Sequence, residues 1–195
     1  AAWADRLFVP TIILASNVQV PKKNRFAFRV FPTEASLATA IADAAVVKDL
    51  KRIAILKPQE IGAERLAIDL SEQLVQRGIK ADLTATYISS NYGSMEEAAR
   101  RIFSLQKGDR EKELATLVYK ARQEAKEKGY GFNKDMVVLP PITDFDAVFI
   151  PDNFKNVRHM VQIFKFLGVK SMVLIGNQQW RSPGLINPYD AFLEG

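Results

Sequence analysis

The sequence contains no cysteine and only one histidine, His159, in its 195 residues. Without cysteine the chain can form no disulfide, no thiolate nucleophile and no cysteine-ligated metal site. No apolar run approaches the length of a membrane span, and residues 1–6 lack the basic and then apolar pattern of a signal peptide. These features exclude several classes of enzyme, but they fit a periplasmic chain and a cytosolic chain equally well.

An excess of positive charge is present, since the net charge is +5 and the isoelectric point lies near 9.4. Basic residues are nevertheless interspersed with acidic ones, as in residues 109–128 (DREKELATLVYKARQEAKEK), a pattern typical of the solvated face of a helix. Aromatic and basic residues do not alternate in the manner of nucleic-acid-binding proteins. We therefore expect no nucleic-acid partner.

Residues 51–70 (KRIAILKPQEIGAERLAIDL) form the most informative stretch of the chain. A short apolar run, Ile53 to Leu56, predicts a strand, and apolar residues at helical spacing after Gly62 predict a helix that buries Leu66, Ile68, Leu70 and Leu74. A strand that is apolar on both faces is typical of a parallel sheet covered by helices. In such sheets ligands bind beyond the carboxyl ends of the strands.

Similar patterns predict the other elements. Thr33 is expected to cap a helix, and Ser94 another, with Glu97 completing a capping box and Gly108 ending that second helix. A charged helix follows to residue 128, and a further helix follows Asn153. The core side of the first helix is expected to carry Leu37, Ile41, Ala44, Ala45 and Val47. The predicted strands are residues 11–14, 25–31, 81–88, 146–150 and 171–175.

Catalytic and metal-binding groups are scarce. His159 is interpreted as a surface side chain, because the apolar stripe of its helix uses Val157, Met160 and Val161. Asp144 and Asp146 alone are weak evidence for a metal, and the loop of residues 57–62 lacks the glycines that cradle phosphate. The sequence predicts no catalytic residue, no metal and no cofactor.

Loops 57–62, 87–92, 151–154 and 176–180 follow the predicted strands. If the strands are parallel, these loops meet at one edge of the sheet, and amides and aromatic rings gather there to form a recognition surface. Alternatives remain open for three of the side chains: Asp152 and Asn153 could cap the next helix, and Trp180 could be core packing.

Five segments resemble the type I periplasmic-binding fold of leucine-binding-type receptors: FVPTIILASN, FAFRVFPTEASLATAIADAAV, RIAILKPQEIGAERLAIDLSEQLVQRGIKADLTATY, DAVFIPDN and GVKSMVLIGNQQW. The resemblance implies an α/β fold, a three-layer αβα architecture with a mainly parallel, flavodoxin-like sheet that makes one lobe of the receptor. Residues 1–33 would be the end of the first lobe and the crossover strand, and residues 34–195 the second lobe. A complete fold of this kind is much longer, so we expect an excised or truncated second lobe.

A charged helical insertion at about residues 107–144, followed by PPITDFDAVFIPDN and GNQQW, resembles more narrowly the penicillin-binding-protein activators. These are envelope lipoproteins related to regulators of peptidoglycan synthases. The resemblance implies a non-enzymatic protein of the periplasm or cell envelope, with a lipid-anchored parent, that regulates peptidoglycan synthesis by contact with a penicillin-binding protein. The alternative is a solute receptor for an amino-acid-like molecule in a transport system.

The resemblance also implies ligand-binding residues. Ile61 stands where the receptors often carry an aromatic residue, which argues against an amino-acid ligand. Apolar residues between positions 1 and 31 are expected to drive dimerisation of the lobe. The residues expected to bind ligand are Ser16, Asn17, Gln59, Glu60, Ile61, Asp152, Asn153, Phe154, Asn177, Gln178 and Trp180.

Overall fold

A computed structural model describes residues 6–13, 25–30 and 32–182 of the chain. Its main sheet contains four parallel strands in the order β4-β3-β5-β6. The strands are β3 (Ile53–Pro58), β4 (Thr84–Tyr87), β5 (Ala147–Ile150) and β6 (Val173–Gly176). The chain therefore adds β4 on one side of β3 and then β5 and β6 on the other, which is the flavodoxin-like order. The predicted α/β fold class is confirmed.

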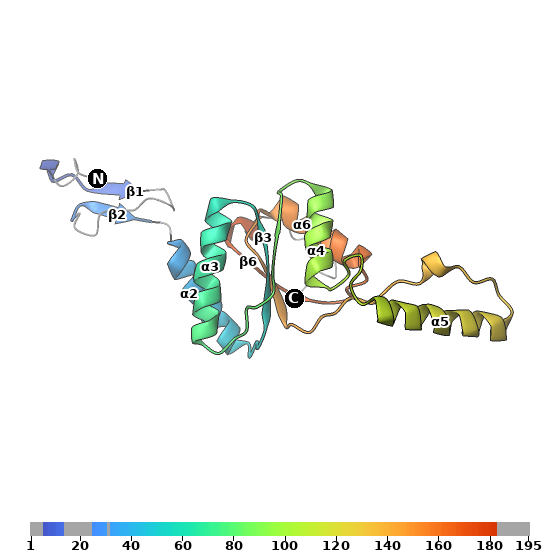
Figure 1. Ribbon diagram of the computed structural model, residues 1–195. Helices are drawn as coiled ribbons and strands as arrows, with labels where there is room; N and C mark the ends of the chain where they lie inside the picture. Colours follow the sequence, from blue (N-terminus) through green and yellow to red (C-terminus); the bar gives the residue numbers. More distant parts are fainter. Residues whose placement is uncertain (1–5, 14–24, 31, 183–195) are drawn as a thin grey trace.

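Helices cover both faces of this sheet (Figure 1). One face carries α2 (Glu34–Val47) and α3 (Ile61–Gln76), and the opposite face carries α4 (Tyr92–Ile102) and α6 (Phe154–Phe166). The result is the predicted three-layer αβα arrangement. Each strand leads into a helix at the same edge of the sheet, so the connecting loops collect there.

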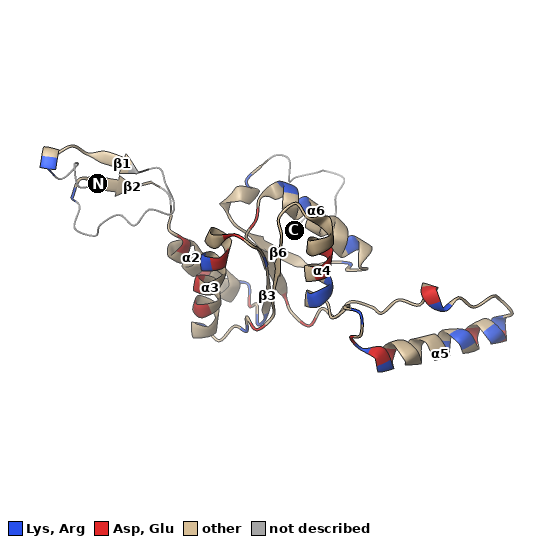
Figure 2. Cartoon of the chain, turned by 45° about the horizontal axis from the view of Figure 1, so that its top comes forward, with Lys and Arg blue, Asp and Glu red and all other residues tan. Residues whose placement is uncertain are grey.

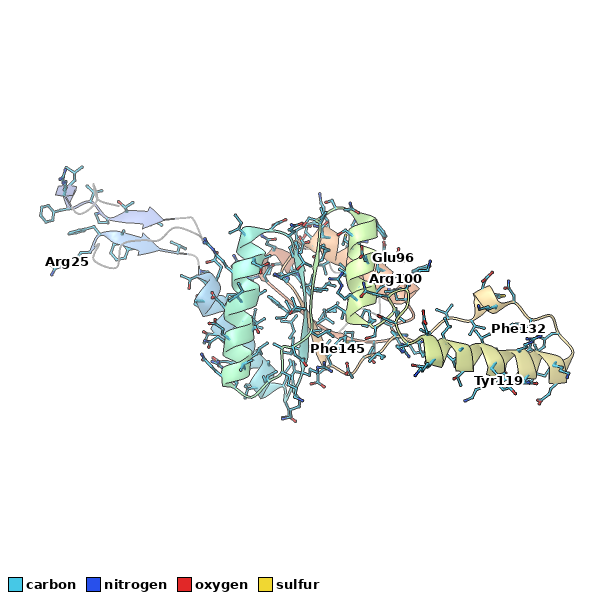
Figure 3. The ribbon with its side chains drawn as sticks, viewed as in Figure 1. Arg25, Glu96, Arg100, Tyr119, Phe132 and Phe145 are labelled. Atoms are coloured by element: carbon cyan, nitrogen blue, oxygen red, sulfur yellow. The ribbon has the colours of Figure 1, made fainter. Side chains whose placement is uncertain are left out.

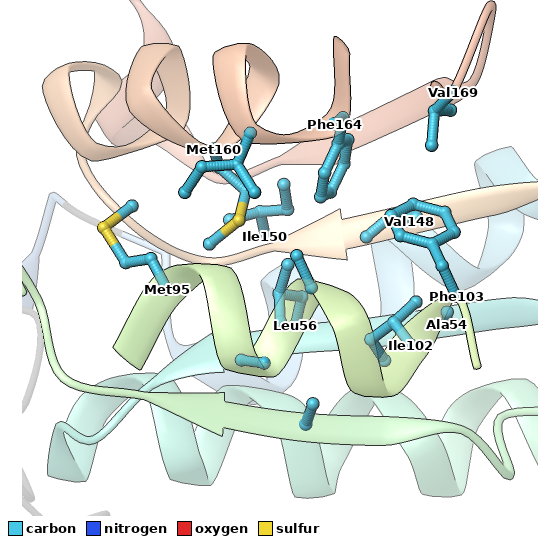
Figure 4. Packing of buried hydrophobic residues seen from close by; sticks show 14 of the residues in the cluster. Ala54, Leu56, Met95, Ile102, Phe103, Val148, Ile150, Met160, Phe164 and Val169 are labelled. Atoms are coloured by element: carbon cyan, nitrogen blue, oxygen red, sulfur yellow. The ribbon is translucent and has the colours of Figure 1, made fainter. Parts of the chain in front are cut away.

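The core divides into two clusters because successive side chains of a strand point to opposite faces. On β3, Ala54 and Leu56 pack with α4 and α6, whereas Ile53 and Ile55 pack with α2 and α3. All four of these β3 side chains are at most 1% exposed. Figure 4 shows the first cluster, in which Met95 and Ile102 of α4 and Met160 and Phe164 of α6 gather on one face of the sheet. The continuous apolar run in the sequence reflects this burial on both faces.

Some predicted helix ends are confirmed and others are wrong. Thr33 caps α2 by accepting a hydrogen bond from the Ser36 amide at 3.1 Å. Helix α4, in contrast, is capped by Asn91, whose side chain accepts from the Ser94 amide at 3.0 Å, and it ends at Ile102. The predicted Ser94 cap and the predicted end at Gly108 are therefore wrong. Ser94 instead accepts a hydrogen bond from the amide of Ile88 at 2.9 Å.

Three expected core residues lie outside the core. Ile68 is 49% exposed and Val47 is 86% exposed, and Ala44 is also exposed. Ile68 follows Leu66 by two residues, which places it about 200° around α3 from that buried side chain. The sequence prediction counted Ile68 as buried because it is apolar and lies between the buried residues Leu66 and Leu70. It did not take into account that Ile68 points to the other side of the helix.

A second, smaller sheet lies apart from the main body in Figure 1. It pairs β1 (Thr11–Ile13) in parallel with β2 (Ala27–Arg29), so the predicted strand at residues 25–31 is shorter than expected. Apolar side chains remain exposed there, including Phe8 at 74% and Phe28 at 55%. The division of the chain at residue 33 and the dimerisation of the lobe stay predictions.

An extended arm projects from the opposite side of the body (Figure 1). It consists of α5 (Glu111–Lys128), the short helix η1 (Lys134–Met136) and residues 137–142, which lead back toward β5. Two hydrogen bonds fix its base: the Ile142 amide donates to the Phe103 carbonyl at 3.0 Å, and Arg110 donates to the Pro140 carbonyl at 2.7 Å. Neither core cluster includes a residue of the arm. In the part of the chain that the structure describes, no helix combines the length and the apolarity needed to pass through a bilayer.

Candidate functional site

The candidate site lies at the carboxyl ends of β3 and β5, which are neighbours in the sheet. The chain leaves β3 for α3 on one face and leaves β5 for α6 on the other face. Connections that depart to opposite faces open a crevice between the two strand ends, and ligands of open α/β sheets bind at such points. Gln59 and Glu60 follow β3, and Asp152 and Asn153 follow β5.

Asp152 organises this edge from a buried position. It is 3% exposed, and its carboxylate accepts hydrogen bonds from the Tyr87 hydroxyl at 2.7 Å and from Asn156 Nδ2 at 3.0 Å to both oxygens. The Asn153 amide and Asn153 Nδ2 donate to Asp152 Oδ1 at 2.6 Å and 2.9 Å. Buried carboxylates need such donors. Asp152 therefore holds the end of β4 and the segment after β5 together, and its oxygens accept hydrogen bonds from protein donors.

Tyr87 is the least expected member of this network. Burial, together with the negative charge of Asp152 and the hydrogen bond to it, holds the pKa of the Tyr87 phenol far above its ordinary value of 10.0. The phenol thus remains a neutral hydrogen-bond donor to Asp152. The alternation of residues 81–88 places Tyr87 on the buried side of β4, and this is the sequence signal that identifies it.

Asn153 caps α6, as the alternative interpretation allowed. Its side-chain oxygen accepts from the amides of Lys155 at 3.0 Å and Asn156 at 3.2 Å. Phe154, the first residue of α6, is partly exposed beside it. The segment after β5 is therefore held in place by its own hydrogen bonds and needs no ligand for this conformation.

Gln59, Glu60 and Ile61 are exposed at the start of α3. Glu60 Oε1 accepts a hydrogen bond from the Ser89 hydroxyl at 3.1 Å, so the loops after β3 and β4 touch. Ile61 is 73% exposed. Lys57, which the sequence analysis passed over, is only 7% exposed at the end of β3 and forms an ion pair with Glu64.

The loop after β6 is built around Trp180. Its indole Nε1 donates to the Ile150 carbonyl at 3.1 Å, and its ring covers Gly176 so closely that a Cβ there would lie 2.0 Å from Cδ2. Trp180 thus packs against the first core cluster. Asn177 caps the short helix η2 (Gln178–Trp180) by accepting from the Gln179 amide at 2.9 Å, and Gln178 is exposed.

Five of the predicted residues line two hollows at this edge, whereas Gln59, Ile61, Asp152 and Trp180 line neither. The first, here called the acidic hollow, has a volume of about 150 Å³ and includes Glu34, Glu60, Asn177 and Gln178 in its lining. The second lies between the first turns of α4 and α6, has a volume of about 490 Å³ and includes Asn153 and Phe154. Ser16 and Asn17 lie outside the described residues. Nothing in the sequence indicated that Glu34 lines this hollow; it is recognisable there only as an acidic residue in the first turn of α2.

His159 is exposed, as predicted, and its ring lies edge-on to Tyr92 with the ring centroids 5.5 Å apart. Within the described ranges, no three side chains of the types that bind metals are grouped closely enough to hold an ion. The groups of this edge are therefore suited to hydrogen bonding and charge recognition.

Comparison with known proteins shows the fold. The structure matches an ABC transporter substrate-binding protein from Desulfitobacterium hafniense in complex with Leu, with a TM-score of 0.53 and 14% identity over 92% of this chain and 42% of that one. A second structure described as an ABC transporter substrate-binding protein from the same organism has a TM-score of 0.55 at 14% identity, over 92% of this chain and 42% of the other. A candidate branched-chain amino acid ABC transporter protein from Rhodospirillum rubrum has a TM-score of 0.58 at 10% identity, over 93% and 41%.

The chain has the fold of one lobe of a type I periplasmic-binding protein, in agreement with the resemblance seen in the sequence. It spans about two fifths of the length of the proteins it matches, which is 42% of the first and 41% of the third. No protein-family model and no curated protein sequence matches it. None of these three structures is described as a penicillin-binding-protein activator, so that narrower resemblance stays a prediction.

Proposed function

We propose that the chain acts as one lobe of a solute receptor, a non-enzymatic periplasmic-binding-like domain of the cell envelope that holds a small, amino-acid-like molecule. The observation that carries this proposal is the acidic hollow, which lies at the carboxyl ends of the strands and is lined by Glu34 and Glu60. This is the alternative reading of the sequence, and the amino-acid transport proteins with the same fold favour it over a regulator of peptidoglycan synthesis.

The chemistry of the acidic hollow suits an ammonium group. Two carboxylates attract a cation, and the amides of Asn177 and Gln178 can donate or accept hydrogen bonds beside it. Asp152 takes no direct part, because its oxygens already accept bonds from Tyr87, Asn153 and Asn156. Its role in this proposal is to keep the strand ends in register. Glu60 is then the exposed carboxylate that meets the ligand.

Thermal unfolding tests the proposal. We expect L-leucine, or another standard amino acid, to raise the unfolding temperature, because a ligand that binds the folded state stabilises it. N-acetyl-L-leucine, which lacks the ammonium group, should produce no rise. The Glu60→Gln variant should lose the effect, while Glu127→Gln on the exposed arm should retain it. The proposal fails if no standard amino acid shifts the transition, or if the acetylated and free amino acids shift it equally.

A second candidate function is contact with a protein partner through the arm, which was the first expectation from the sequence and would involve a penicillin-binding protein. The observation that favours it is the arm itself, which extends away from the body and exposes Tyr119 at 64%, Tyr130 at 54% and Met136 at 79%. Figure 3 shows Tyr119 and Phe132 far from the core. Aromatic and methionine side chains are common anchors of interfaces.

Removal of the arm tests this candidate. Replacing residues 107–141 with a short Gly/Ser linker should leave the fold intact, since neither core cluster uses the arm. If the arm is an interface, a penicillin-binding protein should be retained by the intact chain and lost with the shortened one. Equal retention by both chains, or by neither, would contradict the candidate. Circular dichroism of the shortened chain provides the control for folding.

A further inference from the structure

The second hollow, here called the α4–α6 pocket, has a lining that none of the functions considered so far explains. It lies beside the loop after β4, where Ser90, Tyr92 and Met95 face Phe154, Lys155 and His159 of α6. Its volume of about 490 Å³ falls within the range of small-molecule sites. The acidic hollow shares none of these lining residues.

Positive charge distinguishes this pocket from the acidic hollow. Lys155 and His159 line it, and no aspartate or glutamate does. Helix α6 contains three basic residues, Lys155, Arg158 and Lys165, and no acidic residue, and Figure 2 marks these positions in blue. Over the part of the chain that the structure describes, none of the ion pairs involves Lys155. A cation without a carboxylate partner attracts an anion most effectively where a concave surface limits solvent.

Carboxylates occur on α4 and in the loop before α6, but none of them lines this pocket. Asp152 lies one helical turn before Asn156, but it is buried and its oxygens accept the hydrogen bonds from Tyr87, Asn153 and Asn156. Glu96 on α4 pairs with Arg100, as the side chains in Figure 3 show, and this pair is neutral as a unit. Asp152 keeps its negative charge, because its donors are neutral groups, but it is buried, whereas Lys155 lines the pocket and is exposed to a ligand.

The remaining lining defines the rest of the ligand. The hydroxyl of Ser90 can donate a hydrogen bond, while the Tyr92 hydroxyl lies 3.2 Å from Gln162 Oε1 and is already engaged there. Phe154 is partly exposed and offers apolar surface, whereas Met95, near the start of α4, is fully buried beneath the pocket. A ligand that uses all of these groups carries an acidic group and a compact apolar part.

We propose that the α4–α6 pocket binds the carboxylate or phosphate group of a small acidic molecule, with Lys155 and His159 as its polar contacts and Phe154 as its apolar contact. The proposal rests in part on the proposed function, because Asn153 and Phe154 are among the residues expected to bind ligand. It assigns to this lobe a second site whose charge is opposite to that of the acidic hollow.

NMR spectroscopy of the isotope-labelled whole chain tests the pocket, and the single histidine makes the ring signals of His159 unambiguous. Inorganic phosphate and acetate are titrated separately against chloride at constant pH and constant ionic strength. We expect saturable changes in the His159 ring signals and in the amide signals of Ser90 and Lys155. The anion that produces them at lower concentration identifies phosphate or carboxylate as the preferred group. If neither anion gives a saturable change, the proposal is wrong.

Two matched variants distinguish a specific anion site from nonspecific attraction of anions to the positively charged protein. Lys155→Gln should weaken anion affinity about tenfold, because a charge-assisted hydrogen bond is lost. Lys170→Gln makes the same change of charge just before β6, at the opposite edge of the sheet, and should leave the affinity unchanged. Equal weakening by both variants would overturn the proposal. Both lysines are exposed, and unfolding temperatures should confirm that the two variants fold alike.

The same spectra distinguish failure of this proposal from failure of the proposed function. Titration with L-leucine should move signals of Glu60, Asn177 and Gln178, which line the acidic hollow. If leucine moves those signals and phosphate and acetate leave His159 unchanged, only the anion pocket is disproved. If an anion moves the His159 signals and no amino acid binds, the anion pocket stands without the proposed function.

Discussion

Asp152 is the residue on which the geometry of the candidate site depends. Its buried carboxylate ties the end of β4, through Tyr87, to the start of α6, through Asn153 and Asn156. A carboxylate in such a position is stable only while its donors remain, because an unsatisfied buried acceptor is costly. The sequence predicted that Asp152 contacts a ligand or caps the next helix; the structure shows it accepting hydrogen bonds from Tyr87, Asn153 and Asn156, and contact with a ligand stays a prediction.

We expect Tyr87→Phe to lower the free energy of unfolding by about 1–2 kcal/mol, because Asp152 loses its phenolic donor while the ring remains in the core. Urea denaturation measures this change. Tyr119→Phe, on the exposed face of α5, is the matched control and should have no measurable effect. Equal stability of the two variants would show that the hydrogen bond from Tyr87 to Asp152 contributes nothing.

Asp146 provides a test of pH dependence. The amides of Arg52 at 2.8 Å and Lys51 at 2.6 Å donate to its carboxylate and lower its pKa below the ordinary value of 3.8. A lowered pKa in the folded state contributes stability above the unfolded pKa, and this contribution is lost as the pH falls through the folded pKa. The wild type should thus exceed Asp146→Ala by about 1 kcal/mol near neutral pH, a modest amount because the group is solvent-exposed.

This difference should shrink as the pH is lowered below about 4. Denaturation curves of the wild type and Asp146→Ala at a series of pH values provide the measurement, and Asp135→Ala on the arm is the control. A difference that stays constant down to the acid limit would contradict the assigned cause of the lowered pKa.

At the scale of elements, the contact between β6 and the short helix η2 shapes the edge of the site. Gly176→Ala would place a methyl group against the Trp180 ring, whose Cδ2 and Cε2 atoms lie 2.0 Å and 2.2 Å from the ideal Cβ position. The indole must then leave the Ile150 carbonyl, and we expect a loss of about 2–4 kcal/mol from overpacking and the broken hydrogen bond. Urea denaturation measures it.

Gly62→Ala is the matched control, because no atom lies within 4 Å of a Cβ built at that position in the first turn of α3. We expect this variant to be neutral or to gain up to about 1 kcal/mol from the lower flexibility of alanine. If Gly176→Ala proves as stable as Gly62→Ala, Trp180 does not pack on Gly176 in solution, and it becomes available to a ligand again.

The sequence was sufficient to predict which helices and strands exist. It was not sufficient to predict where each one begins, because that depends on which of several possible hydrogen bonds forms. The apolar run at Ile53 to Leu56 predicted a central parallel strand because burial on both faces leaves no polar side. The start of α4 was missed because Asn91 and Ser94 are both good caps, and only the hydrogen bond from the Ile88 amide to Ser94 decides between them. Local sequence carries no record of that contact.

At the scale of the whole molecule, the sequence predicted which loops converge but could not divide them between two hollows. The strand order β4-β3-β5-β6 brings the ends of β3 and β5 together, and the strand order is not encoded in any single segment. Glu34 reaches the acidic hollow only because α2 packs beside α3, and Lys155 and His159 face Tyr92 only because α4 packs beside α6. These juxtapositions give the edge two hollows, one lined by two glutamates and the other by Lys155 and His159.

The most direct test of the proposed function is NMR titration of the isotope-labelled chain with L-leucine and, in parallel, with N-acetyl-L-leucine. We expect free leucine to move the signals of Gln59 and Glu60 after β3 and of Asn177 and Gln178 after β6, with little change along α5. The acetylated compound should leave these signals in place. If free leucine and the other standard amino acids leave the carboxyl edge of the sheet unchanged, or move mainly the signals of the arm, the chain is not the ligand-binding lobe described here.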